Sequence, residues 1–257
     1  MSGTGHGTID NTSDVFADLA MELYESVGVE HTAAAVLQFV LPAVGCSHAA
    51  MVLAHRSGRP AIAAVTDPIM ETVSQLQMDT GDGPLIVALA DGIPVLVRDS
   101  TTDARWPEWA TKTCELGLRT VLQVPLRTGQ RTTGVLTFGS SGPDAFDAGD
   151  EAIAHILGLH AAIAMGTARH EETLHQAADA RKLIGQAMGI LMERYSLDDE
   201  QAFATLRRYS QDNNIKLHTV ALRLIATRNL PGRSAPPSNS DIAQMTRGRP
   251  ASVQPST

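Results

Sequence analysis

The sequence predicts an α+β domain followed by a long helix and a small all-α unit. Between residues 48 and 140, short apolar runs are bounded by turn residues, as in strands of a sheet. From residue 150 onward, apolar residues recur at three- and four-residue spacing, as in helices. The chain has 257 residues, more than the ~100 to 200 that one domain usually contains. These observations together predict two domains of different fold class.

Two helices are expected before the first strand. Residues 14–27 have the apolar spacing of an amphipathic helix. Residues 33–41 are expected to form a second helix, which Pro42 would end because proline has no amide hydrogen to donate. Residues 1–12 are expected to be flexible.

Five strands are expected to form one antiparallel sheet. Gly-containing turns join the first strand to the second and the fourth to the fifth, which favours hairpins. Residues 69–92 are predicted to form two helices joined by a Gly-Asp-Gly-Pro loop. The pattern is typical of an antiparallel sheet flanked by helices. The strands are expected at 48–55, 61–65, 94–98, 120–126 and 134–140.

A long helical stretch is expected from Asp150 to Tyr195. Four glycines within it each cost ~1 kcal/mol relative to alanine, which favours a bend that divides the stretch in two. An apolar stripe follows alternate three- and four-residue spacing and predicts a parallel coiled-coil dimer. The stripe consists of Ile163, Leu174, Ala177, Ile184, Met188 and Leu191.

Two short helices are expected to complete the all-α unit. Ser196 with Asp199 matches a capping box that would begin the first of them. Its expected apolar face consists of Ala202, Phe203, Leu206 and Tyr209. The last helix is expected over 216–228, ended by Pro231 and Gly232, and the Pro-rich residues 231–257 are expected to be disordered.

Charge is divided unevenly along the chain, whose net charge is -8. Residues 1–179 contain 9 Lys and Arg against 22 Asp and Glu, whereas residues 180–230 contain 8 against 5. An acidic regulatory domain joined to a polyanion-binding unit has this asymmetry. An ordinary solvated surface explains the basic segment equally well.

Several classes of function are not expected. The chain has no signal-peptide pattern and no uninterrupted apolar run of about 18 residues, so we expect a cytoplasmic protein without membrane contact. It contains no P-loop, GxSxG, HExxH or dinucleotide fingerprint, so we expect no enzyme and no catalytic residues. Its histidine pairs are five residues apart and face different directions on a helix, so we expect no metal site. The sequence requires no cofactor.

Residues 181–226 resemble the ANTAR family of RNA-binding transcription antitermination regulators. The resemblance depends on three blocks at family spacing, IGQAMGILMER (184–194), AFATLRRYSQ (202–211) and NIKLHTVA (214–221).

Residues 13–168 look like a GAF domain. The matching blocks are GDGPLIVAL (81–89), PVLVRDSTTDARWPEW (94–109), GLRTVLQVPL (117–126) and GVLTFGSSGPDAF (134–146). Together the two regions resemble a GAF-ANTAR regulator of actinobacterial type. They predict a GAF sensor over 13–168, a helical linker over 169–180 and an ANTAR domain over 181–230.

The resemblance implies a homodimer that binds dual stem-loops in nascent mRNA and prevents formation of a terminator. It also implies a possible small-molecule effector in the GAF domain. Ala187, Phe203 and Ala221 fall on the positions that pack the ANTAR helices together. Met188 departs from the polar or basic residue that relatives usually carry there, and our stripe places it on an apolar seam.

A basic helical bundle can bind RNA through phosphates and exposed loop bases. We expect phosphate contacts from Lys182, Arg207, Arg208, Lys216 and Arg223, and base or sugar contacts from Gln186 and His218. DNA binding is the alternative, because residues 214–226 resemble the first half of a helix-turn-helix. The second half is missing, since a Pro-rich segment follows, but residues 203–209 and the last helix are an alternative pair.

Overall fold

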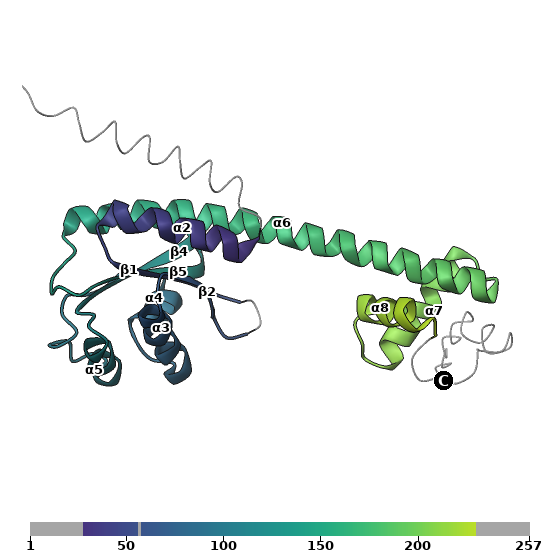
Figure 1. Ribbon diagram of the computed structural model, residues 1–257, viewed down its shortest axis with the longest axis horizontal. Coiled ribbons are helices and arrows are strands. Elements are labelled where there is room, and N and C mark those ends of the chain that lie inside the picture. Colours follow the sequence, from purple (N-terminus) through teal and green to yellow (C-terminus); the bar gives the residue numbers. More distant parts are fainter. Residues whose placement is uncertain (1–27, 56–57, 230–257) are drawn as a thin grey trace, which may run out of the picture. The chain divides into compact units, whose positions relative to one another are not determined.

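The computed structural model describes residues 28–55 and 58–229 (Figure 1). The chain divides into two units between Glu172 and Thr173, and each is described by itself. The segment expected to be flexible (1–12), the helix expected over 14–27 and the tail expected over 231–257 lie outside the described residues.

The first unit contains a five-stranded antiparallel sheet in the order β2-β1-β5-β4-β3. All five predicted strands are present, and the β4–β5 hairpin is longer than predicted. In its register, Leu136 of β5 lies between Met51 of β1 and Val124 of β4. The strands are β1 (His48–Leu53), β2 (Ala61–Val65), β3 (Val95–Val97), β4 (Thr120–Thr128) and β5 (Arg131–Ser140).

Helix α2 (Val29–Val44) and the first half of helix α6 (Ala148–Tyr195) pack on one face of the sheet (Figure 1). Successive strand residues point to opposite faces of the sheet. Leu122 and Val124 of β4 are two residues apart, so both point to the face covered by α2 and α6. Gly158 allows α6 to approach closely, because a Cβ at this position would lie 2.7 Å from Val124 Cγ1.

Three helices pack on the opposite face of the sheet (Figure 1). They are α3 (Pro68–Thr80), α4 (Pro84–Asp91) and α5 (Pro107–Glu115). Helix α5 was not predicted, although Pro107 at its first position and Glu108 in its first turn are helix-start signals. Trp106 and Trp109 are buried there and pack edge to face, with 6.3 Å between their ring centroids.

The structure corrects two sequence predictions about helices, one for α2 and one for α6. Helix α2 continues through Pro42 and ends at Gly45, whose φ is 67°. Pro42 lies in the last turn, where it removes only one hydrogen bond, and Gly45 closes the helix by donating to the Leu41 carbonyl. The expected division of the stretch after Asp150 into two helices is also absent, since α6 is one continuous helix of 48 residues.

Among the described residues, only α6 is long and apolar enough to span a membrane by length and composition. In its most apolar window, 39% of the residues are buried. The buried side chains in the first half of α6, including Leu157 and Met165, belong to the core beneath α2. Packing against the sheet therefore accounts for part of this apolar character, whereas Ile153, Ile156, Leu159 and Ile163 are exposed.

The second unit is a three-helix arrangement of the end of α6, α7 (Asp199–Asp212) and α8 (Leu217–Thr227). The predicted all-α architecture is confirmed. Its core is small and aliphatic, formed by Ala187, Leu191, Leu197, Ala202, Leu206, Val220, Ala221 and Leu224.

The structure corrects two helix termini in this unit. The capping box consists of Asp198 and Gln201 rather than Ser196 and Asp199. Asp198 Oδ1 accepts from the Gln201 amide at 2.7 Å, and Gln201 Oε1 accepts from the Asp198 amide at 3.2 Å. Helix α8 ends at Thr227, before Pro231, because Arg228 adopts a left-handed conformation with φ 57°.

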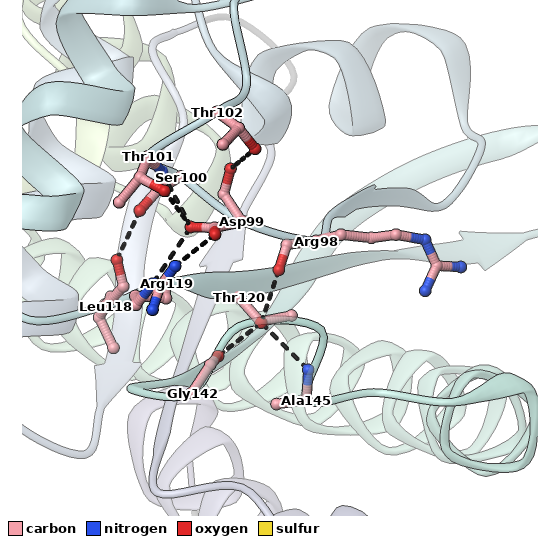
Figure 2. Close-up of polar contacts among 10 residues, drawn as sticks. All are labelled: Arg98, Asp99, Ser100, Thr101, Thr102, Leu118, Arg119, Thr120, Gly142 and Ala145. Atoms are coloured by element: carbon pink, nitrogen blue, oxygen red, sulfur yellow. Dashed lines mark hydrogen bonds and ion pairs between the residues drawn. The ribbon is translucent and has the colours of Figure 1, made fainter.

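Polar contacts tie the loops of the first unit to the start of β4 (Figure 2). The buried Thr120 hydroxyl lies 2.9 Å from the Arg98 carbonyl and 2.7 Å from the Gly142 carbonyl, and it accepts from the Ala145 amide at 3.1 Å. Arg98 follows β3, whereas Gly142 and Ala145 lead into α6. One hydroxyl therefore joins the end of β3 to the connection before α6.

A second contact in the same cluster pairs Asp99 with Arg119 (Figure 2). Asp99 also accepts from the amide and hydroxyl of Thr101, at 3.0 and 2.8 Å. The hydrogen bond from Arg119, helped by those from Thr101, lowers the pKa of Asp99 to about 2.

We predict that Thr120→Val lowers the free energy of unfolding of the first unit by about 1–3 kcal/mol, because it leaves buried polar groups without a partner. Thr120→Ser keeps the hydroxyl and is expected to cost less. Urea unfolding monitored by tryptophan fluorescence measures both, since Trp106 and Trp109 are buried in this unit. Equal stability of the valine variant and wild type would contradict the role of the hydroxyl.

We also predict that Asp99 stabilises the fold in a pH-dependent way. Its folded pKa of about 2 lies below the ordinary value, so the stabilisation is complete above pH ~4 and is lost as the pH falls toward 2. In urea unfolding at a series of pH values, wild type should be more stable than Asp99→Asn at pH 5. This difference should shrink between pH 4 and 2. A constant difference would argue against the Asp99 titration.

Candidate nucleic-acid interface

The seven residues predicted to bind RNA all lie in the second unit, on three different helices. Six of them are exposed, and only His218 is half-buried. They are Lys182 and Gln186 on α6, Arg207 and Arg208 on α7, and Lys216, His218 and Arg223 at the start and along α8.

Four of the five predicted cations form no ion pair with any described residue, namely Lys182, Arg207, Lys216 and Arg223. Arg208 differs, because its Nε lies 3.6 Å from Asp212 Oδ2 one turn along α7. A cation without a carboxylate partner keeps its full charge for a phosphate. The structure therefore divides the predicted cations into four unpaired ones and one paired one.

On α8, the structure brings two of the three predicted residues together. Lys216 is the N-cap of α8 and Arg223 lies seven residues further, about two turns along the helix, so both lie toward the same side. His218 is five residues before Arg223 and lies ~140° away from it. Its Nε2 is 3.3 Å from Thr219 Oγ1. Lys216 and Arg223 can therefore contact one nucleic-acid strand, whereas His218 belongs to a different side of the helix.

On α7, Arg207 and Arg208 diverge by ~100°. Arg207 follows Phe203 by one turn, so the two share one side of the helix. Arg208 lies on the other flank with Asp212.

On α6, Lys182 and Gln186 are one turn apart and share an exposed side. The glycines that follow, Gly185 and Gly189, are also exposed, and a Cβ at either would meet nothing within 4 Å. The surface of α6 beside Lys182 and Gln186 is therefore open.

The packing role expected for three residues is confirmed for two of them. Ala187 and Ala221 are completely buried, but the Phe203 side chain is 39% exposed. The core side of α7 is defined by Ala202 and Leu206, and Phe203 lies ~100° around the helix from Ala202. Exposure of an aromatic ring at this position is the feature that the sequence analysis missed.

The apolar stripe predicted along α6 is divided between two environments. Ile184, Met188 and Leu191 pack in the core of the second unit, so they are not available as a seam between two copies. Ile163 and Leu174 are 69% and 56% exposed. Met188 accordingly lies on an apolar side of α6, as predicted, but the surface it contacts belongs to the same chain.

The first unit encloses several polar side chains on the side covered by α3, α4 and α5. Gln123 Oε1 accepts from the Thr137 hydroxyl at 2.7 Å. Gln123 Nε2, Trp109 Nε1 and Thr113 Oγ1 are buried without a hydrogen-bond partner in the structure. Within residues 28–55 and 58–229, no group of three or more His, Cys, Asp or Glu side chains could hold a metal ion.

Comparison with known families gives two matches along the chain. Residues 26–166 match the GAF domain, and residues 172–225 match the ANTAR domain. No curated protein sequence matches the chain.

Solved structures similar to this chain include the GAF domain of an Acinetobacter phosphoenolpyruvate-protein phosphotransferase. It is 17% identical, with a TM-score of 0.50, and the match covers 62% of this chain and 95% of that chain. The corresponding domain from Coxiella burnetii is 16% identical, with a TM-score of 0.49 and coverage of 65% and 99%. Free methionine-R-sulfoxide reductase from Neisseria meningitidis is 18% identical, with a TM-score of 0.49 and coverage of 66% and 96%.

At these identities the likeness to solved structures concerns the fold alone, and the fold of the Acinetobacter GAF domain agrees with the sheet and helices of the first unit. The GAF match covers more than half of the chain, and the ANTAR match covers the three helices that present the unpaired cations. The chain therefore belongs to the GAF family and is a GAF-ANTAR protein, in which a GAF domain precedes an ANTAR domain.

Proposed function

We propose that this protein is a signal-responsive regulator whose ANTAR domains bind paired stem-loops in nascent transcripts and prevent transcription termination. GAF domains are small-molecule sensors and ANTAR domains are RNA-binding antitermination modules. The observation that carries the proposal is the set of exposed, unpaired cations on the three ANTAR helices. We place the protein in the cytoplasm and assign it no catalytic activity.

The electrostatics of the two domains support this division of roles. Most of the acidic residues of the chain lie before residue 180, whereas the ANTAR segment has more Lys and Arg than Asp and Glu. Phosphate binding gains free energy by releasing condensed counterions, and only cations that are not already neutralised contribute. Lys182, Arg207, Lys216 and Arg223 meet that condition.

Two paired stem-loops require two ANTAR domains, and α6 offers a surface that can bring them together. Ile156 and Ile163 each follow a buried alanine by two residues, so each lies ~200° around α6 from the side packed on the sheet. Exposed apolar clusters on a soluble domain mark interaction sites. We propose that a second copy covers them. The exposed large apolar residues of α6 in the GAF domain are Ile153, Ile156, Leu159 and Ile163.

Signal transfer would use α6, which contributes to the cores of both domains. An effector in the GAF domain can shift the packing of α6 only if it binds the two arrangements with different affinity. Thr120 ties the segment before α6 to the end of β3, so movement of the β3–α5 loop would act on the start of the helix.

DNA binding is the second candidate, and the connection between α7 and α8 favours it. Only four residues, 213–216, separate these helices, as in a helix-turn-helix. The two candidates differ in the ligand that the unpaired cations contact.

We predict that Lys216→Glu combined with Arg223→Glu weakens binding to a two-hairpin RNA and flattens its salt dependence. Each lost phosphate contact lowers the slope of log K against log salt by ~0.7 to 0.9. Fluorescence anisotropy at several salt concentrations measures both effects.

The matched control is Arg59→Glu with Lys112→Glu, which makes the same charge change on exposed residues of the GAF domain. Equal loss of affinity in both variants would show a general effect of net charge. Tighter binding of duplex DNA than of the hairpins would favour the DNA-binding candidate.

We predict that Ile163→Glu converts a dimer to a monomer, because it would bury two carboxylates in the proposed contact, at the residue of this surface that is most exposed in the single chain. Sedimentation equilibrium measures the mass. The control is His175→Glu, at another exposed position of α6 that lies ~120° around the helix from Ile163. A wild-type monomer, or dissociation by both variants alike, would rule out this contact surface.

A further inference from the structure

Helix α7 exposes an aromatic ring beside an unpaired cation. Phe203 is 39% exposed, whereas Tyr195 and Tyr209 of the same domain are half-buried and packed against its core. Moving a phenylalanine side chain from water into a core is favourable, so the exposed Phe203 ring lacks part of that stabilisation.

The neighbours of Phe203 on this side of α7 are polar or charged. Arg207 lies one turn after it and forms no ion pair with a described residue, and Gln211 lies one turn further. Glu200 lies one turn before it. Among the described residues, cation–π contacts occur at Trp106 and Tyr195, so the ring of Phe203 is not covered by Arg207.

We propose that Phe203 stacks against an unpaired base in an RNA loop while Arg207 binds the adjoining phosphate. This inference rests on the proposed function and adds a mode of recognition to it. Proteins that recognise RNA loops stack splayed bases on aromatic side chains. A phenylalanine ring has no hydrogen-bonding group, so it can stack on the face of any base. Stacking on Phe203 therefore does not distinguish one base from another.

The charge next to the ring favours a nucleic acid over a protein as the occupant. A protein surface that covered Phe203 would also desolvate Arg207, which is costly without a carboxylate or phosphate partner. An RNA strand supplies the base and the phosphate together.

Glu200 disfavours a phosphate at the N-terminal end of this side, because its exposed carboxylate repels the phosphate charge. The phosphate contact is therefore expected on the Arg207 side of the ring. Removing this charge by Glu200→Gln is expected to increase RNA affinity. The substitution leaves the Phe203 ring in place, so stacking of the loop base should not change.

The experiment compares the full chain with Phe203→Leu, which keeps an apolar side chain but removes the ring, and with Phe203→Tyr, which keeps the ring. The probe is a two-hairpin RNA with short purine loops, one loop base being 2-aminopurine. A second RNA has the same stems but abasic loops. Anisotropy gives the affinities, and 2-aminopurine fluorescence reports stacking of the loop base.

For Phe203→Leu we expect an affinity at least about fivefold weaker for the intact loops, the lower limit for stacking one base on an aromatic ring. The change in 2-aminopurine fluorescence should be lost as well. Phe203→Tyr should behave as wild type, and all three proteins should bind the abasic RNA equally. Circular dichroism melts show whether the leucine variant is folded, as expected for an exposed position.

The outcomes separate this inference from the proposed function. If wild type binds the hairpins and Phe203→Leu binds them equally well, the stacking role is wrong and RNA binding stands. If Phe203→Leu weakens binding to intact and abasic loops alike, or changes the sedimentation mass, the ring serves packing or a protein contact and the inference falls. If wild type binds neither RNA, both the inference and the proposed function fail.

Discussion

The architecture depends on one helix whose two ends are buried in two different cores. In the first half of α6, small and apolar residues such as Ala154 and Ala161 pack against the sheet. In its last turns, Ala187 and Leu191 pack against α7 and α8. Gly158 is part of this arrangement, because any side chain there would collide with Val124. Because α6 is part of both cores, a change in its packing within either domain would reduce the buried area there.

The same constraint determines what remains exposed on α6. Once the sheet has covered one side, Ile156 and Ile163 are left on the other. The predicted stripe assigned Ile184, Met188 and Leu191 to a contact between copies, but the small ANTAR core requires these residues. A dimer contact through α6 is therefore expected within the GAF domain, where the apolar surface has no intramolecular partner among the described residues.

Electrostatic pairing distinguishes the two domains. In the GAF domain, the carboxylates of Asp99 and Asp103 are bound by Arg119 and Arg105, which fixes loops next to the sheet. In the ANTAR domain, most of the predicted cations have no such partner, and Arg208 is the exception. An ion pair of this kind holds loops in place, but its cation is already neutralised by a carboxylate. Unpaired cations on a small domain contribute little to folding and remain available for phosphates.

The sequence by itself determined the two fold classes, the five strands, the ANTAR core positions Ala187 and Ala221, and the helices that carry the cations. The strands and helices follow from periodicity and turn residues, which act over a few neighbours along the chain, whereas the resemblance to the ANTAR family implied the packing positions Ala187 and Ala221. Only the tertiary structure decided that Pro42 lies within a helix, that Asp198 rather than Ser196 caps α7, that Arg208 is paired and that Phe203 is exposed. Each of these depends on which side of a helix its neighbours cover, and coverage is decided by packing between segments that are distant in the sequence.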